Sequence, residues 1–149
     1  MNQTLELYRS TGNKEFTQII TEFAPYFSTI NPMFIELKPG YAEIMLPNTK
    51  NVHNHLGTVH AIAMCNAAEL VAGMMTEVSI PDTYRWIPVG MTVKYLKKAK
   101  TDLTTVARED GIDWSALGEI NVPVSVFDTD GDEVFSAVIT MSVSLKKKA

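Results

Sequence analysis

The sequence predicts an α+β fold in which one curved antiparallel sheet wraps around a long central helix. The run from Thr58 to about Thr76 is nearly all apolar and has the length of one helix, about 28 Å at 1.5 Å per residue. Alternating apolar and polar residues predict two strands before this run and four after it. Because a helix without a wide polar face must be covered on most sides, we expect the strands to form its cover.

The composition is that of an ordinary globular chain. With 149 residues, 46% hydrophobic and 20% charged, the chain can bury a core in one domain, which we expect to span residues 1–149. The formal net charge of −4 argues against a general nucleic-acid surface. Cys65 is the single cysteine, and the first residues lack the apolar core of a signal peptide. We therefore expect a cytoplasmic protein without disulfides.

The chain before the central helix predicts one amphipathic helix and a hairpin. Apolar residues at the spacing i, i+3, i+4, i+7 predict a helix from about Asn13 to Phe23. Alternation predicts strands over Met33–Lys38 and Tyr41–Leu46, and Pro39-Gly40 supplies the turn between them.

The central helix is expected to begin at Thr58, with Thr58 as its N-cap and Gly57 allowing a tight turn into it. Polar residues interrupt its apolar run at three positions, His60, Asn66 and Glu69. These interruptions indicate a buried helix of a globular fold and not a membrane span.

The rest of the chain supplies the larger part of the sheet. Four β-type runs follow the helix, over Tyr84–Ala99, Asp102–Glu109, Glu119–Asp128 and Glu133–Leu145. The segment Asp128-Thr-Asp-Gly131 is a strong turn signal between the last two runs. We expect all the strands to join one antiparallel sheet.

This order of elements resembles the hotdog fold, and one motif resembles the acyl-CoA thioesterases of that fold. Many of these enzymes carry an Asn or Gln, then six residues later a His-Gly-Gly at the start of the helix, and an Asp or Glu nine residues after the His. Asn54, His60 and Glu69 have this spacing. The resemblance covers about residues 30–145, and three further segments share it: Gly40–Pro47, Met91–Ala99 and Val124–Gly131. It is closest to thioesterases of the phenylacetate-pathway type, including their poorly characterised branches.

The resemblance implies hydrolysis of acyl-CoA to free acid and CoA. Glu69 would activate water or attack the thioester carbon, and the backbone N–H of Ala61, with that of Ile62, would hold the carbonyl oxygen. Asn54 and His60 would orient the substrate. The residues themselves agree in part, since a carboxylate buried in an apolar helix costs several kcal/mol unless it is hydrogen-bonded, and helix-start N–H groups suit an oxyanion. Each residue also has a structural interpretation. Asn66 would hydrogen-bond Glu69, Asn54 would close a loop turn, and His60 would only cap the helix or pack against its neighbours.

Ala61-Ile62 departs from the Gly-Gly of these thioesterases. The Cβ of Ala61 and the branched side chain of Ile62 narrow the approach of a ligand to the backbone. This departure motivates a second hypothesis, a non-catalytic module that binds acyl-CoA or lipid.

A third hypothesis rests on His55, which lies 14 residues before Glu69. Hydroxyacyl-thioester dehydratases of the same fold use a His and a Glu at this separation, but their Pro-Gly pairs are absent here. The spacing of His53, His55 and His60 matches no compact ligand motif, so we expect no metal. No cofactor is expected either, since CoA enters as part of the substrate.

The remaining expectations concern substrate contacts and assembly. Gly57 and Ile62 are expected to border the substrate, and Lys97 and Lys98 either meet the CoA phosphates or form a solvated face. A lone hotdog leaves strand edges unpaired, and the resemblance places active sites between two chains. We therefore expect a homodimer or a dimer of dimers.

Overall fold

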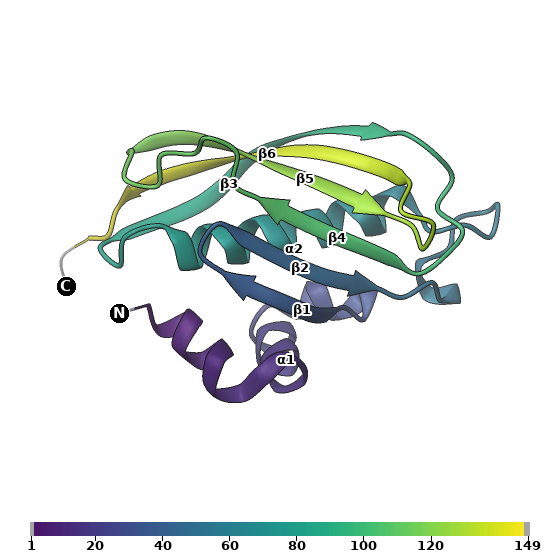
Figure 1. The fold of residues 1–149 in the computed structure, drawn as a ribbon, viewed down its shortest axis with the longest axis horizontal. Coiled ribbons are helices and arrows are strands. Elements are labelled where there is room, and N and C mark those ends of the chain that lie inside the picture. The colour runs from purple at the N-terminus through teal and green to yellow at the C-terminus, as the bar shows by residue number, and fades with distance from the viewer. Residues whose placement is uncertain (1, 148–149) are drawn as a thin grey trace.

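The computed structural model describes residues 2–147. Six strands form one antiparallel sheet in the order β1-β2-β4-β5-β6-β3. Figure 1 shows this sheet arching over α2, with α1 beside β1. The helices are α1 (Gln3–Phe23) and α2 (Ala61–Ser79), and the short 3-10 helices are η1 (Pro25–Ile30) and η2 (Lys50–Val52). The strands are β1 (Met33–Lys38), β2 (Tyr41–Leu46), β3 (Tyr84–Tyr95), β4 (Leu103–Arg108), β5 (Gly118–Phe127) and β6 (Glu133–Leu145).

The strand predictions are confirmed, with small changes at their ends. β1, β2 and β6 have the predicted bounds, and β4 and β5 differ by one residue at each end. The prediction for β3 was too long, because the strand ends at Tyr95 and not at Ala99. Ala99 instead accepts a hydrogen bond from the Val59 N–H at 2.8 Å, so the segment after β3 holds the loop that precedes α2.

α2 is the core helix. Small residues let the sheet approach its backbone closely, and Ala67, Ala68 and Ala72 have no exposed surface. It is the one described helix long and apolar enough to cross a membrane, but 67% of the relevant 18-residue window is buried inside the fold. This supports the prediction of a buried helix wrapped by a sheet.

α1 is longer than predicted and contains a break. Gly12 has φ +81°, which interrupts the helical backbone, and the predicted helix is the part after this break. Phe16 lies there and packs edge-to-face against Tyr8 and Phe34. The Asn13 amide donates to the Ile35 carbonyl at 3.1 Å, so α1 partly covers the outer edge of β1.

β3 is the other edge strand, and two of its exposed residues are aliphatic. Ile87 is 62% exposed and Val89 is 55% exposed. The register of β3 against β6 shifts between Pro88 and Gly90, which bends the strand at these residues. An exposed edge strand is a natural place for another chain to pair.

Candidate active site

α2 begins at Ala61, and His60 is its N-cap. The Nδ1 atom of His60 accepts the Ile62 N–H at 3.0 Å, and the His60 N–H donates to the Val52 carbonyl at 2.7 Å. The prediction of Thr58 as N-cap was wrong, because the Thr58 N–H and hydroxyl are engaged by Asn54. His60 therefore lies just before the first turn of the helix and not within it.

The side chain of Asn54 is occupied by its own loop. Its Oδ1 accepts the backbone N–H groups of Leu56 at 2.9 Å and Thr58 at 3.1 Å, and its Nδ2 donates to the Thr58 hydroxyl at 2.8 Å. Gly57 has φ +76°, a left-handed conformation that glycine adopts without strain. Asn54 therefore shapes the loop before α2, which agrees with the alternative prediction that Asn54 closes a loop turn.

The N–H groups at the start of α2 are not equally available. The Ile62 N–H donates to His60, and the Ala63 and Met64 N–H groups donate to the His60 carbonyl. Within residues 2–147 the Ala61 N–H has no acceptor. Only one of the two expected carbonyl-binding donors is therefore free, and it is the one at the position of the first family glycine.

Glu69 is partly buried and has no hydrogen bond or ion pair to any residue from 2 to 147. It borders a surface pocket of about 190 Å³ whose other lining residues are Tyr26, Phe27, Ile62, Cys65, Asn66 and Met91. The pocket is mostly apolar, and burial raises the pKa of the Cys65 thiol, so that Cys65 stays protonated at neutral pH. The Glu69 carboxylate is thus the candidate reactive group of this pocket.

Asn66 does not bind Glu69. Its Nδ2 atom donates to the Tyr26 carbonyl at 3.4 Å and to the Thr29 hydroxyl at 3.3 Å, which joins η1 to α2 beside Glu69. Its Oδ1 atom is buried without a partner among the described residues. No functional role of Asn66 itself was predicted from the sequence, although a buried amide in an apolar helix indicates a polar contact.

The single chain does not bring Asn54, His60 and Glu69 into one pocket. Asn54 and Ala61 border a pocket of about 300 Å³, and His60 borders another of about 410 Å³. Ala61 and Glu69 are eight residues apart on α2, which is about 12 Å along the helix axis. One carbonyl group cannot be held at Ala61 and attacked at Glu69 over this distance within one chain.

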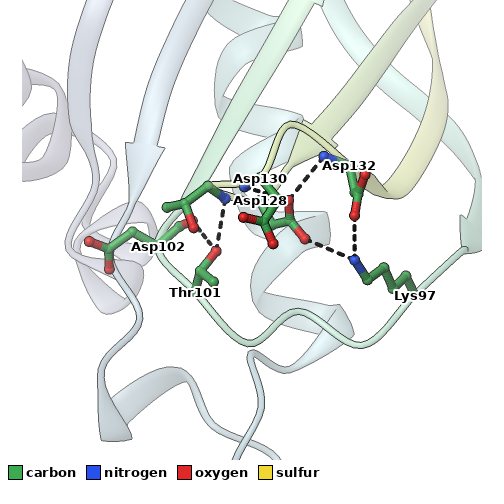
Figure 2. A network of polar contacts seen from close by, with 7 residues as sticks. Lys97, Thr101, Asp102, Asp128, Asp130 and Asp132 are labelled. Atoms are coloured by element: carbon green, nitrogen blue, oxygen red, sulfur yellow. Dashed lines mark hydrogen bonds and ion pairs between the residues drawn. The ribbon is translucent and has the colours of Figure 1, made fainter.

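Lys97 and Lys98 border the same pocket as Asn54, but their charges differ in availability. Figure 2 shows Lys97 reaching the carboxylates of the β5–β6 turn. Its Nζ atom lies 2.6 Å from Asp132 and 3.3 Å from Asp128. Hydrogen bonds to these carboxylates raise the pKa of Lys97. Lys98 is exposed and has no ion pair in the described chain.

The histidines form no metal-binding group with Glu69 among residues 2–147; the cluster with suitable ligand geometry there is Asp128, Asp130 and Asp132. Lys97 already neutralises part of that cluster. His53 Nε2 lies 2.7 Å from the Asn48 side-chain oxygen. His55 is exposed and lies outside the residues that line the Glu69 pocket.

The fold is the hotdog fold, because the sheet and helix superpose on solved proteins of that class. A protein named APC5556 is 52% identical, covers 97% of this chain and 98% of its own, and has a TM-score of 0.89. PA5026 from Pseudomonas aeruginosa, a protein of unknown function and probable thioesterase, is 22% identical, with coverages of 85% and 91% and a TM-score of 0.77. A mutant of the thioesterase PA1618 from the same organism is 17% identical, with coverages of 91% and 96% and a TM-score of 0.78.

The chain belongs to the family described as Domain of unknown function (DUF4442), which matches residues 12–143. No curated protein matches this chain. Because the thioesterase structures have low sequence identity to this chain, their similarity shows the shared fold alone. The function depends on the residues of this chain.

Proposed function

We propose that the protein hydrolyses acyl-CoA thioesters to free acid and CoA, with Glu69 as the general base. The observation that supports this proposal is a partly buried carboxylate in an apolar pocket without a partner among residues 2–147. Keeping such a group unpaired is unfavourable for the fold, so a role in chemistry explains its presence better than a structural role. The thioesterases among the structures of this fold agree with the reaction class.

The reaction needs one base and one hydrogen-bond donor. Glu69 takes a proton from a water molecule as the water oxygen attacks the thioester carbon. The carbonyl oxygen becomes negative and accepts the free N–H of Ala61 at the positive end of α2. The C–S bond then breaks, the carbonyl re-forms, and Glu69 returns its proton to the leaving CoA sulfur. The products are the free acid, CoA thiol and the regenerated carboxylate.

We further propose that each site uses two copies of the chain, with Glu69 from one and Ala61 from the other. Ala61 and Glu69 of one chain are about 12 Å apart along the helix, so they cannot act on the same carbonyl group. The β3 edge, with Ile87 and Val89 exposed on it, offers the pairing surface, and Met91 on this strand already borders the Glu69 pocket. A two-fold pairing of β3 edges would set the two α2 helices side by side and in opposite directions.

Lys98, at the pocket that Asn54 and Ala61 border, is proposed to meet a phosphate of CoA. Gly57 and Ile62 would border the pantetheine arm. In this proposal Asn54 acts indirectly, since its amide shapes the loop that carries Gly57.

The test is a thiol-release assay on purified protein with aliphatic acyl-CoAs and phenylacetyl-CoA. Release of CoA with the matching free acid supports hydrolysis, and a preference for phenylacetyl-CoA would place the protein with the phenylacetate type. Tight binding of acyl-CoA without thiol release would instead favour the non-catalytic module, which the engaged Ile62 N–H and the Ala61 Cβ also favour. Addition of water to an enoyl thioester that His55→Ala abolishes would favour the dehydratase.

The two-copy site is tested by light scattering during gel filtration. The double variant Ile87→Lys and Val89→Lys charges the β3 edge and should give a monomer without thioesterase activity. Leu117→Lys is the matched control, because Leu117 is 53% exposed and lies outside β3. A monomeric wild-type protein with full activity would contradict the two-copy site but not hydrolysis itself.

A further inference from the structure

Trp86 on β3 lies across α2 one helical turn beyond Glu69. A Cβ atom at Gly73 would be 2.8 Å from the Cη2 atom of Trp86 and 3.3 Å from its Cζ3 atom, so the ring rests directly on the glycine backbone. The indole Nε1 atom donates to the Glu77 carboxylate at 3.1 Å. The ring is therefore fixed by a contact that only glycine permits and by a hydrogen bond at its polar edge.

Glu69, Gly73 and Glu77 lie on one face of α2, because their positions are i, i+4 and i+8. β3 runs along this face. Its Met91 borders the Glu69 pocket, and its Trp86, five residues earlier, covers Gly73 and reaches Glu77. The helix face that begins at Glu69 is thus open at Glu69 and closed at Gly73.

We propose that Trp86 is the end wall of the acyl-binding site and restricts the enzyme to short acyl groups. This rests on the proposed hydrolysis, which places the thioester carbon at Glu69. From Glu69 to Gly73 the helix rises about 6 Å, which is the length of roughly five bonds of an extended chain, since three bonds span 3.8 Å. On the same scale, an acyl group of up to about six carbons spans the distance along the helix from the carboxylate to the indole.

The specificity follows from how the wall is built. Gly73 allows the ring to lie close to the helix, and Glu77 holds the ring against rotation. A longer acyl chain would have to displace a ring that is packed and hydrogen-bonded. Displacing such a ring is less favourable than displacing a flexible aliphatic side chain, so the ring discriminates more strongly between short and long acyl groups.

The experiment measures kcat/KM for butanoyl-, hexanoyl-, octanoyl- and dodecanoyl-CoA. Trp86→Ala should raise the ratio of octanoyl to butanoyl activity at least tenfold, the lower end of what one methylene contributes in an apolar pocket. Trp114→Phe is the matched control. The Trp114 indole donates a hydrogen bond to Glu109, which follows β4, so this substitution should leave the activity ratio unchanged. If Trp86→Ala folds poorly, Trp86→Leu keeps apolar volume and should give a smaller shift in the same direction. A change by the same factor for every chain length would overturn the proposal.

A binding measurement separates failure of this proposal from failure of the proposed hydrolysis. In Trp114→Phe, Trp86 is the remaining one of the two tryptophans, so the emission of the protein reports its surroundings. Hexanoyl-CoA should change this emission and CoA alone should not. If wild-type protein releases no thiol but this difference is seen, the acyl site stands and the hydrolysis fails. If thiol is released and the emission does not respond to the acyl group, the hydrolysis stands and the wall is refuted.

Discussion

The two ends of α2 differ in how their polar groups are satisfied. In the N-terminal half, called the open end and running from Ala61 to Glu69, three polar groups have no partner within residues 2–147: the Ala61 N–H, the Asn66 Oδ1 and the Glu69 carboxylate. At the C-terminal end, Glu77 accepts from Trp86 and its carbonyl accepts from Asn2 at 2.8 Å, while the Ser79 hydroxyl accepts the Gly40 N–H at 2.9 Å.

The difference shows where the fold leaves hydrogen-bonding capacity for a ligand. Folded proteins satisfy nearly all of their buried polar groups, so three unpaired groups in one half of one helix point to a function there. Substitutions at the open end should therefore change activity more than stability, and loss of the Glu77 carboxylate at the closed end should change stability more than activity toward short acyl groups.

The largest effect is expected from Glu69→Gln at the open end. Glutamine keeps the shape of the side chain but cannot take the proton, so kcat should fall about 10²- to 10⁴-fold. The melting temperature should not fall, since no partner of Glu69 is lost. Steady-state kinetics and calorimetry check both, with Glu22→Gln on the exposed surface of α1 as control. Activity that survives Glu69→Gln would remove the base from the mechanism.

The next effect is that of Ala61→Pro, which deletes the free N–H without deleting a hydrogen bond. Proline suits the first position of a helix, and His60 before it already has φ −65° and ψ 136°, which a following proline tolerates. We expect kcat to fall about 10²- to 10³-fold, as for loss of an oxyanion donor, with the melting temperature unchanged or slightly higher.

Ala61→Gly keeps the N–H and restores the residue of the thioesterase motif. Its activity should equal or exceed that of the wild type. Equal activity of Ala61→Pro and wild-type protein would show that this N–H does not contact the carbonyl oxygen.

At the closed end, Glu77→Ala should lower stability by about 1 kcal/mol, because Trp86 Nε1 loses its acceptor. For a chain of this size that corresponds to a melting temperature lower by about 2–4 °C. Glu77→Gln retains an acceptor oxygen and should keep most of the stability. Thermal unfolding followed by circular dichroism measures both variants, and a fall of the same size in Glu69→Gln would remove the contrast between the two ends.

The smallest effect is expected from Lys98→Ala beside the open end. KM for acyl-CoA should rise up to about fivefold, because an exposed ion pair contributes at most about 1 kcal/mol. Lys97→Ala should change KM less, since its charge is already paired with Asp128 and Asp132. An acyl-pantetheine thioester lacks the nucleotide phosphates and should show no difference between wild type and Lys98→Ala.

The sequence predicts the strands and the central helix well because each depends on a repeated local pattern. The alternation in β5 buries Ile120, Val122, Val124 and Val126, and the Pro39-Gly40 turn fixes the first hairpin. The cap of α2 was missed because Thr58 and His60 are both plausible N-caps, and the choice depends on Asn54 binding Thr58. The first half of α1 was missed because Gly12 ends the apolar periodicity there.

The candidate site was predictable as a set of residues but not as an arrangement. The spacing of Asn54, His60 and Glu69 marks them, but only the folded chain shows that they border three different pockets. The position of Trp86 over Gly73 and beside Glu77 could not be predicted from the sequence, because it depends on the pairing of β3 with β6 along α2.

The hydrogen bonds of the Asn2 side chain affect where a purification tag should be placed. The Asn2 Oδ1 accepts the Leu5 N–H at 2.9 Å at the start of α1, and its Nδ2 donates to the Glu77 carbonyl in the last turn of α2. A single amide thus joins the start of one helix to the end of another. A purification tag fused directly before Asn2 would crowd this joint, so a tag placed after the exposed Lys146 and Lys147 is the better choice for crystallisation and assays.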